Sequence, residues 1–180
     1  LDLVNSGITQ KIESALGDGN YVGYVKLDPA KPFTVKDPDA NVTYGGANNK
    51  LVANGAALVA GVSGWHRLTV DTKALTYEIK EYRIGLVGSA TPNGWDAPDQ
   101  KMEYDHATGT WNITIDLVSG DIKFRVNDDW GWNLGGPLDA LTVDGSNISV
   151  TAGKYTITLT ITKPNSVKGE VGGKCTITKK

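Results

Sequence analysis

The chain has 180 residues, of which 39% are hydrophobic and 21% are charged, a composition typical of a folded globular protein. Its formal net charge is -2, and its lysines and arginines are scattered, so no basic stripe exists that would follow a phosphate backbone and a nucleic-acid partner is not expected. No apolar run approaches the roughly 20 residues that a membrane helix needs. Because the chain begins at Leu1 without an initiator methionine, we expect a processed or partial form whose export signal or lipid anchor lies outside it.

The first twenty residues carry a helical spacing. Ile8, Ile12 and Leu16 follow Ser6 at intervals of four, which predicts a short amphipathic helix. Later segments alternate apolar and polar residues, which predicts half-buried antiparallel strands. This alternation is clearest at 111–117, 122–126 and 155–161. Trp111 alternates with polar residues and is expected in the core, and the single cysteine, Cys175, is expected as a small apolar residue of a terminal strand.

The two halves of the chain repeat each other at a nearly constant offset. The matching segments are Tyr44-Gly45-Gly46 with Leu134-Gly135-Gly136, 33–37 with 124–128, and Leu51, Gly55 and Leu58 with Leu141, Gly145 and Ile148. We therefore predict an all-β protein of two tandem immunoglobulin-like β-sandwich modules, residues 1–82 and 83–180. The second module opens with the strand 84–88 and a loop from Ser89 to Asp99. The first module has no comparable strand or tryptophan loop in its sequence, so we expect its start to be truncated or altered.

Three of the five tryptophans, Trp95, Trp130 and Trp132, lie in polar loops of the second half. An indole on a loop, beside groups that bind hydroxyls, is suited to stack on the apolar face of a sugar ring. Trp130 and Trp132 are separated by one glycine, and one of them is expected as a platform and the other as a loop anchor, without a choice between them. For Trp65 two interpretations stay open: packing near the junction of the modules, or no special role.

A polar strip precedes this loop. If Ile122, Phe124 and Val126 point into the core, then the outward face carries the side chains of Lys123, Arg125 and Asn127. A cation and an amide on such a strip could reach the hydroxyls of a stacked sugar. Arg125 could equally be a solvated charge that pairs with a neighbour.

No pattern points to catalysis, and we predict no catalytic residue, metal site or cofactor. His66 and His106 are isolated and fit neither a triad nor a zinc spacing. The carboxylates lie mostly in turns, where capping is favoured over a calcium loop. These are Asp96, Asp99, Asp128, Asp129, Asp139 and Asp144.

Several of these segments together resemble a known family. The runs 84–95, 122–127 and 130–136, with 23–25, 44–46 and 68–71 in the first half, are similar to the tandem starch-binding modules of SusE/SusF-type outer-membrane lipoproteins of Gram-negative bacteria. The resemblance covers most of the chain except residues 1–18. It implies non-catalytic immunoglobulin-like modules, lipid-anchored on the cell surface, that hold an α-glucan near an outer-membrane transporter and a separate amylase.

The family's sites combine an aromatic arc with a cation and an asparagine. The resemblance maps these roles to Trp95, to Trp130 or Trp132, to Lys123 or Arg125, and to Asn127 or Asn133. The first module departs from the pattern, because residues 37–41 contain no tryptophan, so its site is expected to be weak or absent. Two alternatives stay open: a structural or protein-interaction module of a surface complex, and an accessory module of a glycosidase.

Overall fold

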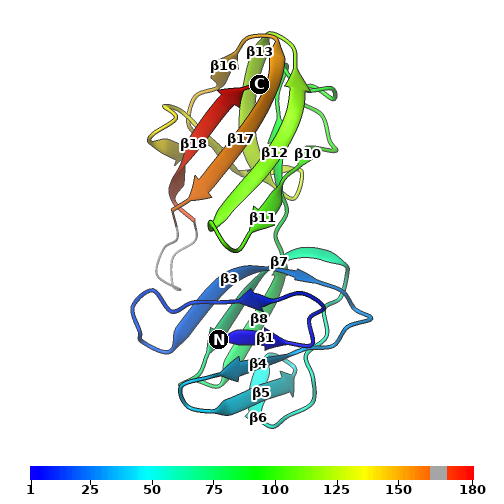
Figure 1. The fold of residues 1–180 in the computed structure, drawn as a ribbon, viewed down its shortest axis with the longest axis vertical. Coiled ribbons are helices and arrows are strands. Elements are labelled where there is room, and N and C mark those ends of the chain that lie inside the picture. Colours follow the sequence, from blue (N-terminus) through cyan, green and yellow to red (C-terminus); the bar gives the residue numbers. More distant parts are fainter. Residues whose placement is uncertain (163–169) are drawn as a thin grey trace. The chain divides into compact units, whose positions relative to one another are not determined.

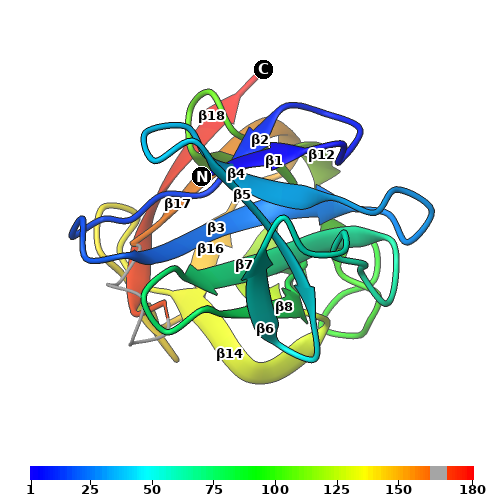
Figure 2. The ribbon, with the colours of Figure 1, turned by 90° about the horizontal axis from the view of Figure 1, so that it is seen from below.

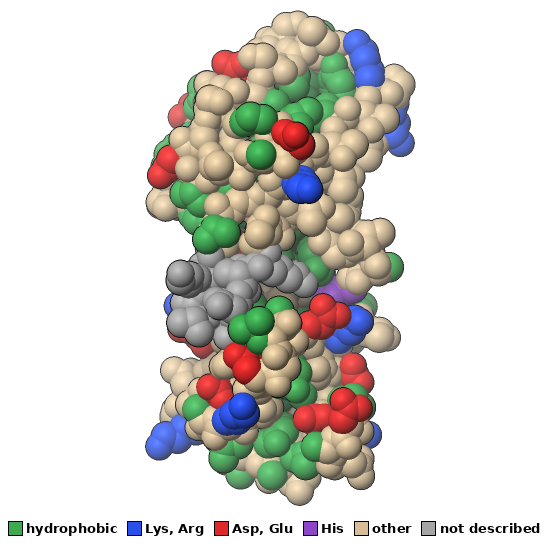
Figure 3. Space-filling view, turned by 90° about the vertical axis from the view of Figure 1, so that its left-hand side faces the viewer, with side chains coloured by type: hydrophobic (Ala, Val, Ile, Leu, Met, Phe, Trp, Pro, Cys, Tyr) green, Lys and Arg blue, Asp and Glu red, His purple; other side chains and the backbone are tan. Residues whose placement is uncertain are grey.

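The computed structural model of the chain describes residues 1–162 and 170–180 (Figure 1). The regular structure of these residues is β, and the strands pair antiparallel throughout. Within them, no helix has the length and apolar character needed to cross a membrane. The described residues form two compact units, unit 1 with residues 1–82 and unit 2 with residues 83–162 and 170–180. Acidic and basic side chains are interspersed on the face drawn in Figure 3.

Unit 1 contains the first eight strands. They are β1 (Asp2–Val4), β2 (Gln10–Lys11), β3 (Asn20–Leu27), β4 (Thr34–Asp37), β5 (Val42–Ala47), β6 (Lys50–Ala53), β7 (Gly64–Asp71) and β8 (Thr76–Glu81). Their order in the sheet is β2-β1-β4-β5-β6-β8-β7-β3. The pairs β1–β4 and β3–β7 can be followed in Figures 1 and 2. The core is built from alternate residues such as Val25, Val35, Leu68 and Val70, all fully buried.

Unit 2 contains the remaining ten strands. They are β9 (Ile84–Val87), β10 (Gln100–Lys101), β11 (Glu103–Asp105), β12 (Thr110–Leu117), β13 (Gly120–Val126), β14 (Asp129–Gly135), β15 (Leu141–Val143), β16 (Ile148–Val150), β17 (Gly153–Ile161) and β18 (Gly172–Lys179). The sheet runs β10-β9-β13-β14-β15-β18-β17-β12-β11, with β16 paired to β13. Trp111 is fully buried, as predicted. Cys175 lies in the terminal strand β18, also as predicted, and burial raises the pKa of its thiol to about 12.

The repeat predicted from the sequence is present in the structure, but the match of 33–37 with 124–128 is wrong by two residues, because Phe33 bridges to Leu58 as Ile122 pairs with Ile148. From β2 to β3, the strand order of unit 1 matches that of unit 2 from β10 to β12 position by position. The backbone bonds match as well: Gly46 N–H donates to the Ala56 carbonyl at 2.6 Å, and Gly136 N–H donates to the Ser146 carbonyl at 2.7 Å. A Cβ on Gly45 would collide with the carbonyl oxygens of Gly55 and Ala56, and a Cβ on Gly135 with the equivalent oxygens of Gly145 and Ser146. Both units therefore need glycine at this position.

Two expectations for the start of unit 1 are wrong. β1 pairs with β4 as β9 pairs with β13, so the strand thought missing is present. What is shorter is the following loop, residues 5–9 in unit 1 and residues 88–99 in unit 2. The predicted helix is absent, because only Ile12 is buried and Ile8 and Leu16 are exposed. Of the three residues spaced by four, Ile12 alone belongs to the core, and its N–H donates to the Leu1 carbonyl across the β1–β2 hairpin.

Candidate functional site

Two indole rings from different loops meet on unit 2. Trp95 lies in the loop 88–99, and Trp130 lies in β14. Their ring centroids are 5.9 Å apart and their planes are inclined by 42°. Trp130 is 44% exposed and Trp95 is half-buried, so the pair presents aromatic surface to solvent. Exposed aromatic rings that converge in this way are an unusual use of apolar surface and indicate a contact site.

A closed loop holds Trp95. Gly88 N–H donates to the Gly94 carbonyl at 2.9 Å, and the Thr91 hydroxyl and N–H both donate to the Gly88 carbonyl. Gly88 has a φ of 145° and a Cβ there would collide with the Asp121 carbonyl, so this position needs glycine. The loop is thus tied at its base and carries the indole next to the β13–β14 hairpin.

A β-bulge holds Trp130. Arg125 pairs with Asn133, but the next residue of β13, Val126, pairs with Asp129. Residues 130–132 are therefore left out of the ladder and bulge from the strand, which turns their side chains away from the regular alternation. Both tryptophans of β14 owe their placement to this bulge.

The bulge gives the two tryptophans different roles. Trp130 lies against Trp95. Trp132 is half-buried, and its Nε1 donates to the Glu170 carbonyl at 3.0 Å. Trp130 is therefore the exposed ring of the bulge, and Trp132 is tied to the backbone at residue 170.

Beneath the aromatic pair lies a buried ion pair that the sequence does not reveal. Arg125 Nε donates to Asp99 Oδ2 at 2.7 Å and Arg125 Nη2 donates to Asp99 Oδ1 at 2.6 Å. Both side chains are at most 3% exposed. The bonds to Asp99 raise the pKa of the Arg125 guanidinium above its ordinary value, although desolvation acts against this. Because Asp99 takes both of these donors, the charge of Arg125 is largely compensated inside the protein.

The ion pair lies against the ring of Trp130. The Arg125 guanidinium carbon lies 4.5 Å from the centroid of the Trp130 ring, a cation–π contact. Asp99 fits at this position because residue 85 is a glycine: a Cβ on Gly85 would collide with the Asp99 Cβ. Asp128 Oδ1 accepts from the Asp99 N–H at 2.8 Å. Contacts therefore link Asp99 to Arg125, Arg125 to Trp130, and Trp130 to Trp95.

The prediction of an outward, solvated polar strip is wrong. Lys123 and Arg125 are buried, with exposures of 9% and 2%. Arg125 is buried because the loop that carries Asp99 covers it, and the side chain of Lys123 lies against Gly135 of the neighbouring strand β14. The assignment of Asp99 to turn capping is wrong as well, because its carboxylate pairs with Arg125.

The two asparagines of the predicted site have structural contacts. Asn127 has a φ of 55°, and its Oδ1 accepts from the Arg83 N–H at 2.8 Å, which closes the end of β13. Asn133 is 5% exposed, and its Nδ2 donates to Asp144 Oδ1 at 2.8 Å and to the Trp130 carbonyl at 3.4 Å. Asn133 therefore holds the bulge from behind. Its Oδ1 is buried and has no hydrogen-bond partner within residues 1–162 and 170–180.

A small cavity of about 170 Å³ adjoins the ion pair. It is lined in part by Arg83, Pro98, Asp99, Lys101 and Asp128. Sequence reasoning did not single out Arg83 or Lys101, because neither belongs to a tryptophan loop or to the polar strip 123–127. The cavity therefore has charged hydrogen-bonding groups next to Asp99, the partner of Arg125.

Elsewhere, the residues that the structure describes contain no group of three or more His, Cys, Asp or Glu side chains that could hold a metal ion. His106 packs edge-on against Tyr104, with ring centroids 5.1 Å apart. Trp65 is buried in β7, and Lys26 Nζ lies 5.6 Å from the centroid of its ring. The convergence of exposed aromatic rings is thus confined, among the predicted residues, to Trp95 and Trp130.

Comparison with known proteins gives little sequence similarity. The chain matches no protein-family model and no curated protein. Among solved structures, it is similar to SusF from Bacteroides thetaiotaomicron, with a TM-score of 0.37 and 15% sequence identity. The match covers 99% of this chain and 48% of the SusF chain, so this chain spans about half the length of that protein.

Proposed function

We propose that the protein binds a glycan without transforming it, and that the Trp95–Trp130 pair of unit 2 is the binding platform. The observation that carries this proposal is the meeting of the half-buried indole of Trp95, from the loop 88–99, with the exposed indole of Trp130, from the bulge of β14, next to a buried ion pair. The apolar face of a sugar ring fits an indole, and two rings can engage successive sugar units. Because these aromatic residues are fixed by a tied loop and a bulge, little ordering is needed when ligand binds.

The inclination of the two rings bears on the type of glycan. Platforms 42° apart suit a chain whose successive sugar rings are inclined to one another, as in a curved α-glucan. A flat, extended β-glucan would engage one ring well and the other poorly. We therefore propose starch or another α-glucan as the ligand. Each stacked ring contributes about 1 kcal/mol beyond burial of its area, which is suited to reversible retention of a polymer.

The proposal gives each predicted site residue a role. Arg125, with Asp99, positions Trp130; Asn133 and Trp132 hold the bulge, and Asn127 closes the strand end. We propose that groups of the adjoining cavity, Lys101 and Asp128 among them, bind ligand hydroxyls. Lys123, which is buried, serves the sheet and not the ligand.

At the level of the whole protein, we propose two immunoglobulin-like sandwich modules, residues 1–82 and 83–180, of which the second is the carbohydrate-binding module. The repeated strand order supports this assignment, and so does the sequence resemblance to SusE/SusF-type lipoproteins. By the same resemblance we propose display on the outer membrane through a lipid outside this chain, next to a transporter for the glycan.

Titration of the protein with maltoheptaose, a cyclodextrin and cellohexaose, followed by tryptophan fluorescence, tests the proposal. We expect saturable quenching by maltoheptaose and the cyclodextrin and a weaker response to cellohexaose. Absence of a response to every soluble glycan would contradict glycan binding. An equal response to all three would contradict the preference for a curved chain.

A further inference from the structure

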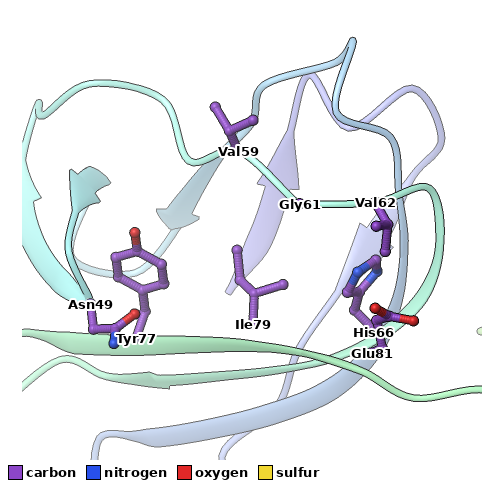
Figure 4. A pocket seen from close by; sticks show the side chains of 8 residues that line it. All are labelled: Asn49, Val59, Gly61, Val62, His66, Tyr77, Ile79 and Glu81. Carbon is purple, nitrogen blue, oxygen red and sulfur yellow. The ribbon is translucent and has the colours of Figure 1, made fainter. Parts of the chain in front are cut away.

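Unit 1 lacks the tryptophans of unit 2 but has a groove of its own at a different place in the fold. The groove has a volume of about 320 Å³ and lies between β8 and the segment of residues 59–62 (Figure 4). In Figure 4 this segment passes over Tyr77, Ile79 and Glu81, the side chains that rise from β8.

The groove arises because β8 leaves its neighbour early. β8 pairs with β6 only through Thr76 and Lys50, whereas it pairs with β7 along its whole length. Tyr77, Ile79 and Glu81 are alternate residues, so they project from one face, which is the face of their partners Val70, Leu68 and His66. Leu68 and Val70 are fully buried, but Tyr77 and Ile79 are only partly covered. The apolar layer of the core thus continues into an open groove.

The lining is apolar along the middle and polar at both ends. His66 Nδ1 lies 2.9 Å from the Gly64 carbonyl oxygen, which can only accept, so Nδ1 is the donor of this hydrogen bond. Glu81 lies directly across the ladder from His66, and Figure 4 shows the two side chains side by side beneath Val62. Asn49, which can donate and accept, lies at the opposite end beside Tyr77.

We propose that this groove is a second sugar-binding site, which takes one or two pyranose units of a neutral glycan. A pyranose ring presents an apolar face to Tyr77 and Ile79 and hydroxyls to the groups at the two ends. An anionic ligand does not fit, because Glu81 is present and none of the described lining residues is a lysine or an arginine. A divalent cation does not fit either, because Glu81 and Asn49 offer too few oxygen ligands.

The inference rests on the proposed function only for the chemical class of the ligand. Two weak sites on one chain would hold a polymer more tightly than either alone, because the second contact is intramolecular. The first unit would then contribute to retention although the tryptophan pair Trp95–Trp130 lies in unit 2.

The test uses the full chain with Trp130→Ala, which removes the platform of unit 2, and titrates it with maltoheptaose while backbone amide shifts are recorded by NMR. We expect saturable shifts at Tyr77, Ile79 and His66. Adding Val62→Asp, at a 43% exposed valine over the groove, weakens this response about tenfold or more. Val52→Asp, at a 54% exposed valine outside the groove, is the matched control and leaves it unchanged.

The outcomes separate the two proposals. If the wild-type chain responds at Trp95 and Trp130 but the groove amides do not shift, the second site is wrong and the proposed function stands. If only the groove responds, the second site stands and the platform is wrong. Equal loss in Val62→Asp and Val52→Asp also contradicts the groove, because it would mean that binding depends on the general charge of the unit.

Discussion

The two units have sheets of the same strand order and differ in the loop and the bulge that are added to the sheet. Their strand orders match, and the same glycine hydrogen bond crosses the hairpin in both. Unit 2 has a long loop at 88–99 and a bulge at 130–132, where unit 1 has residues 5–9 and a regular ladder from Val35 to Asp37. The difference teaches that the aromatic pair comes from two local additions and not from the fold.

The residues beneath the loop 88–99 and the bulge 130–132 also differ between the two units. Arg125 pairs with Gly85 in unit 2, and the matching ladder position in unit 1 pairs Lys36 with Asp2. Gly85 leaves room for Asp99, whereas Asp2 carries a side chain at that place. A buried arginine is therefore accommodated only where a glycine makes room for the aspartate that pairs with it.

The largest expected effect comes from breaking that ion pair. Asp99→Asn keeps the shape of the side chain but leaves the Arg125 charge buried and uncompensated, so the free energy of unfolding of unit 2 falls by about 3 to 5 kcal/mol. Urea unfolding followed by labelling of Cys175 measures this, because its thiol is buried, has a raised pKa and lies in unit 2. Glu78→Gln, in the exposed Lys80–Glu78 pair of unit 1, is the control and costs less than about 1 kcal/mol. Equal effects of the two changes would show that the Arg125–Asp99 pair has no special weight.

The shared glycines test the equivalence of the units. Gly45→Ala and Gly135→Ala each push a methyl group against a backbone carbonyl, and each destabilises its own unit by about 1 to 3 kcal/mol. Hydrogen exchange resolved by unit measures the two losses separately. Gly61→Ala, which meets open space, is the control. A large loss in one unit and none in the other would break the equivalence of the repeat.

Removal of the exposed indole tests the site that only unit 2 has. Trp130→Ala weakens maltoheptaose binding by about 2 kcal/mol, or roughly thirtyfold in Kd, because the sugar loses its platform. Isothermal titration calorimetry measures the change. Leu138→Ala, at another exposed apolar residue of unit 2, is the control with unchanged Kd. An unaltered Kd in Trp130→Ala would remove Trp130 from the site.

The smallest effect is expected at the anchor of the bulge. Trp132→Phe loses the Nε1 bond to the Glu170 carbonyl and lowers the free energy of unfolding of unit 2 by about 1 kcal/mol. The Kd for maltoheptaose changes little, since Phe still fills the half-buried position. Thermal unfolding and calorimetry on the same sample check both statements. A loss of binding without a loss of stability would exchange the roles of Trp130 and Trp132.

Sequence reasoning reached the strands and the repeat because side-chain alternation and glycine spacing are local signals. The alternation at 111–117 and 122–126 predicted β12 and β13 correctly. Alternation reports which side chains share a face, but not whether a distant loop covers that face, and so Lys123 and Arg125 were expected at the surface. Asp99 and Arg125 are 26 residues apart, on a loop and a strand, and no local pattern joins them. The bulge that separates Trp130 from Trp132 is likewise invisible in the residue types.

The position of β18 in the sheet has a consequence for synthesis. The last strand of unit 2 lies between β15 and β17, and its counterpart in unit 1 is β8, between β6 and β7. As the chain leaves the ribosome, unit 1 can complete its sheet once Glu81 has emerged. Unit 2 must keep β15 and β17 apart, with open edges, until residues 172–179 have emerged. The unit that carries the Trp95–Trp130 pair therefore keeps open strand edges, which favour wrong pairing, until its residues 172–179 have been made.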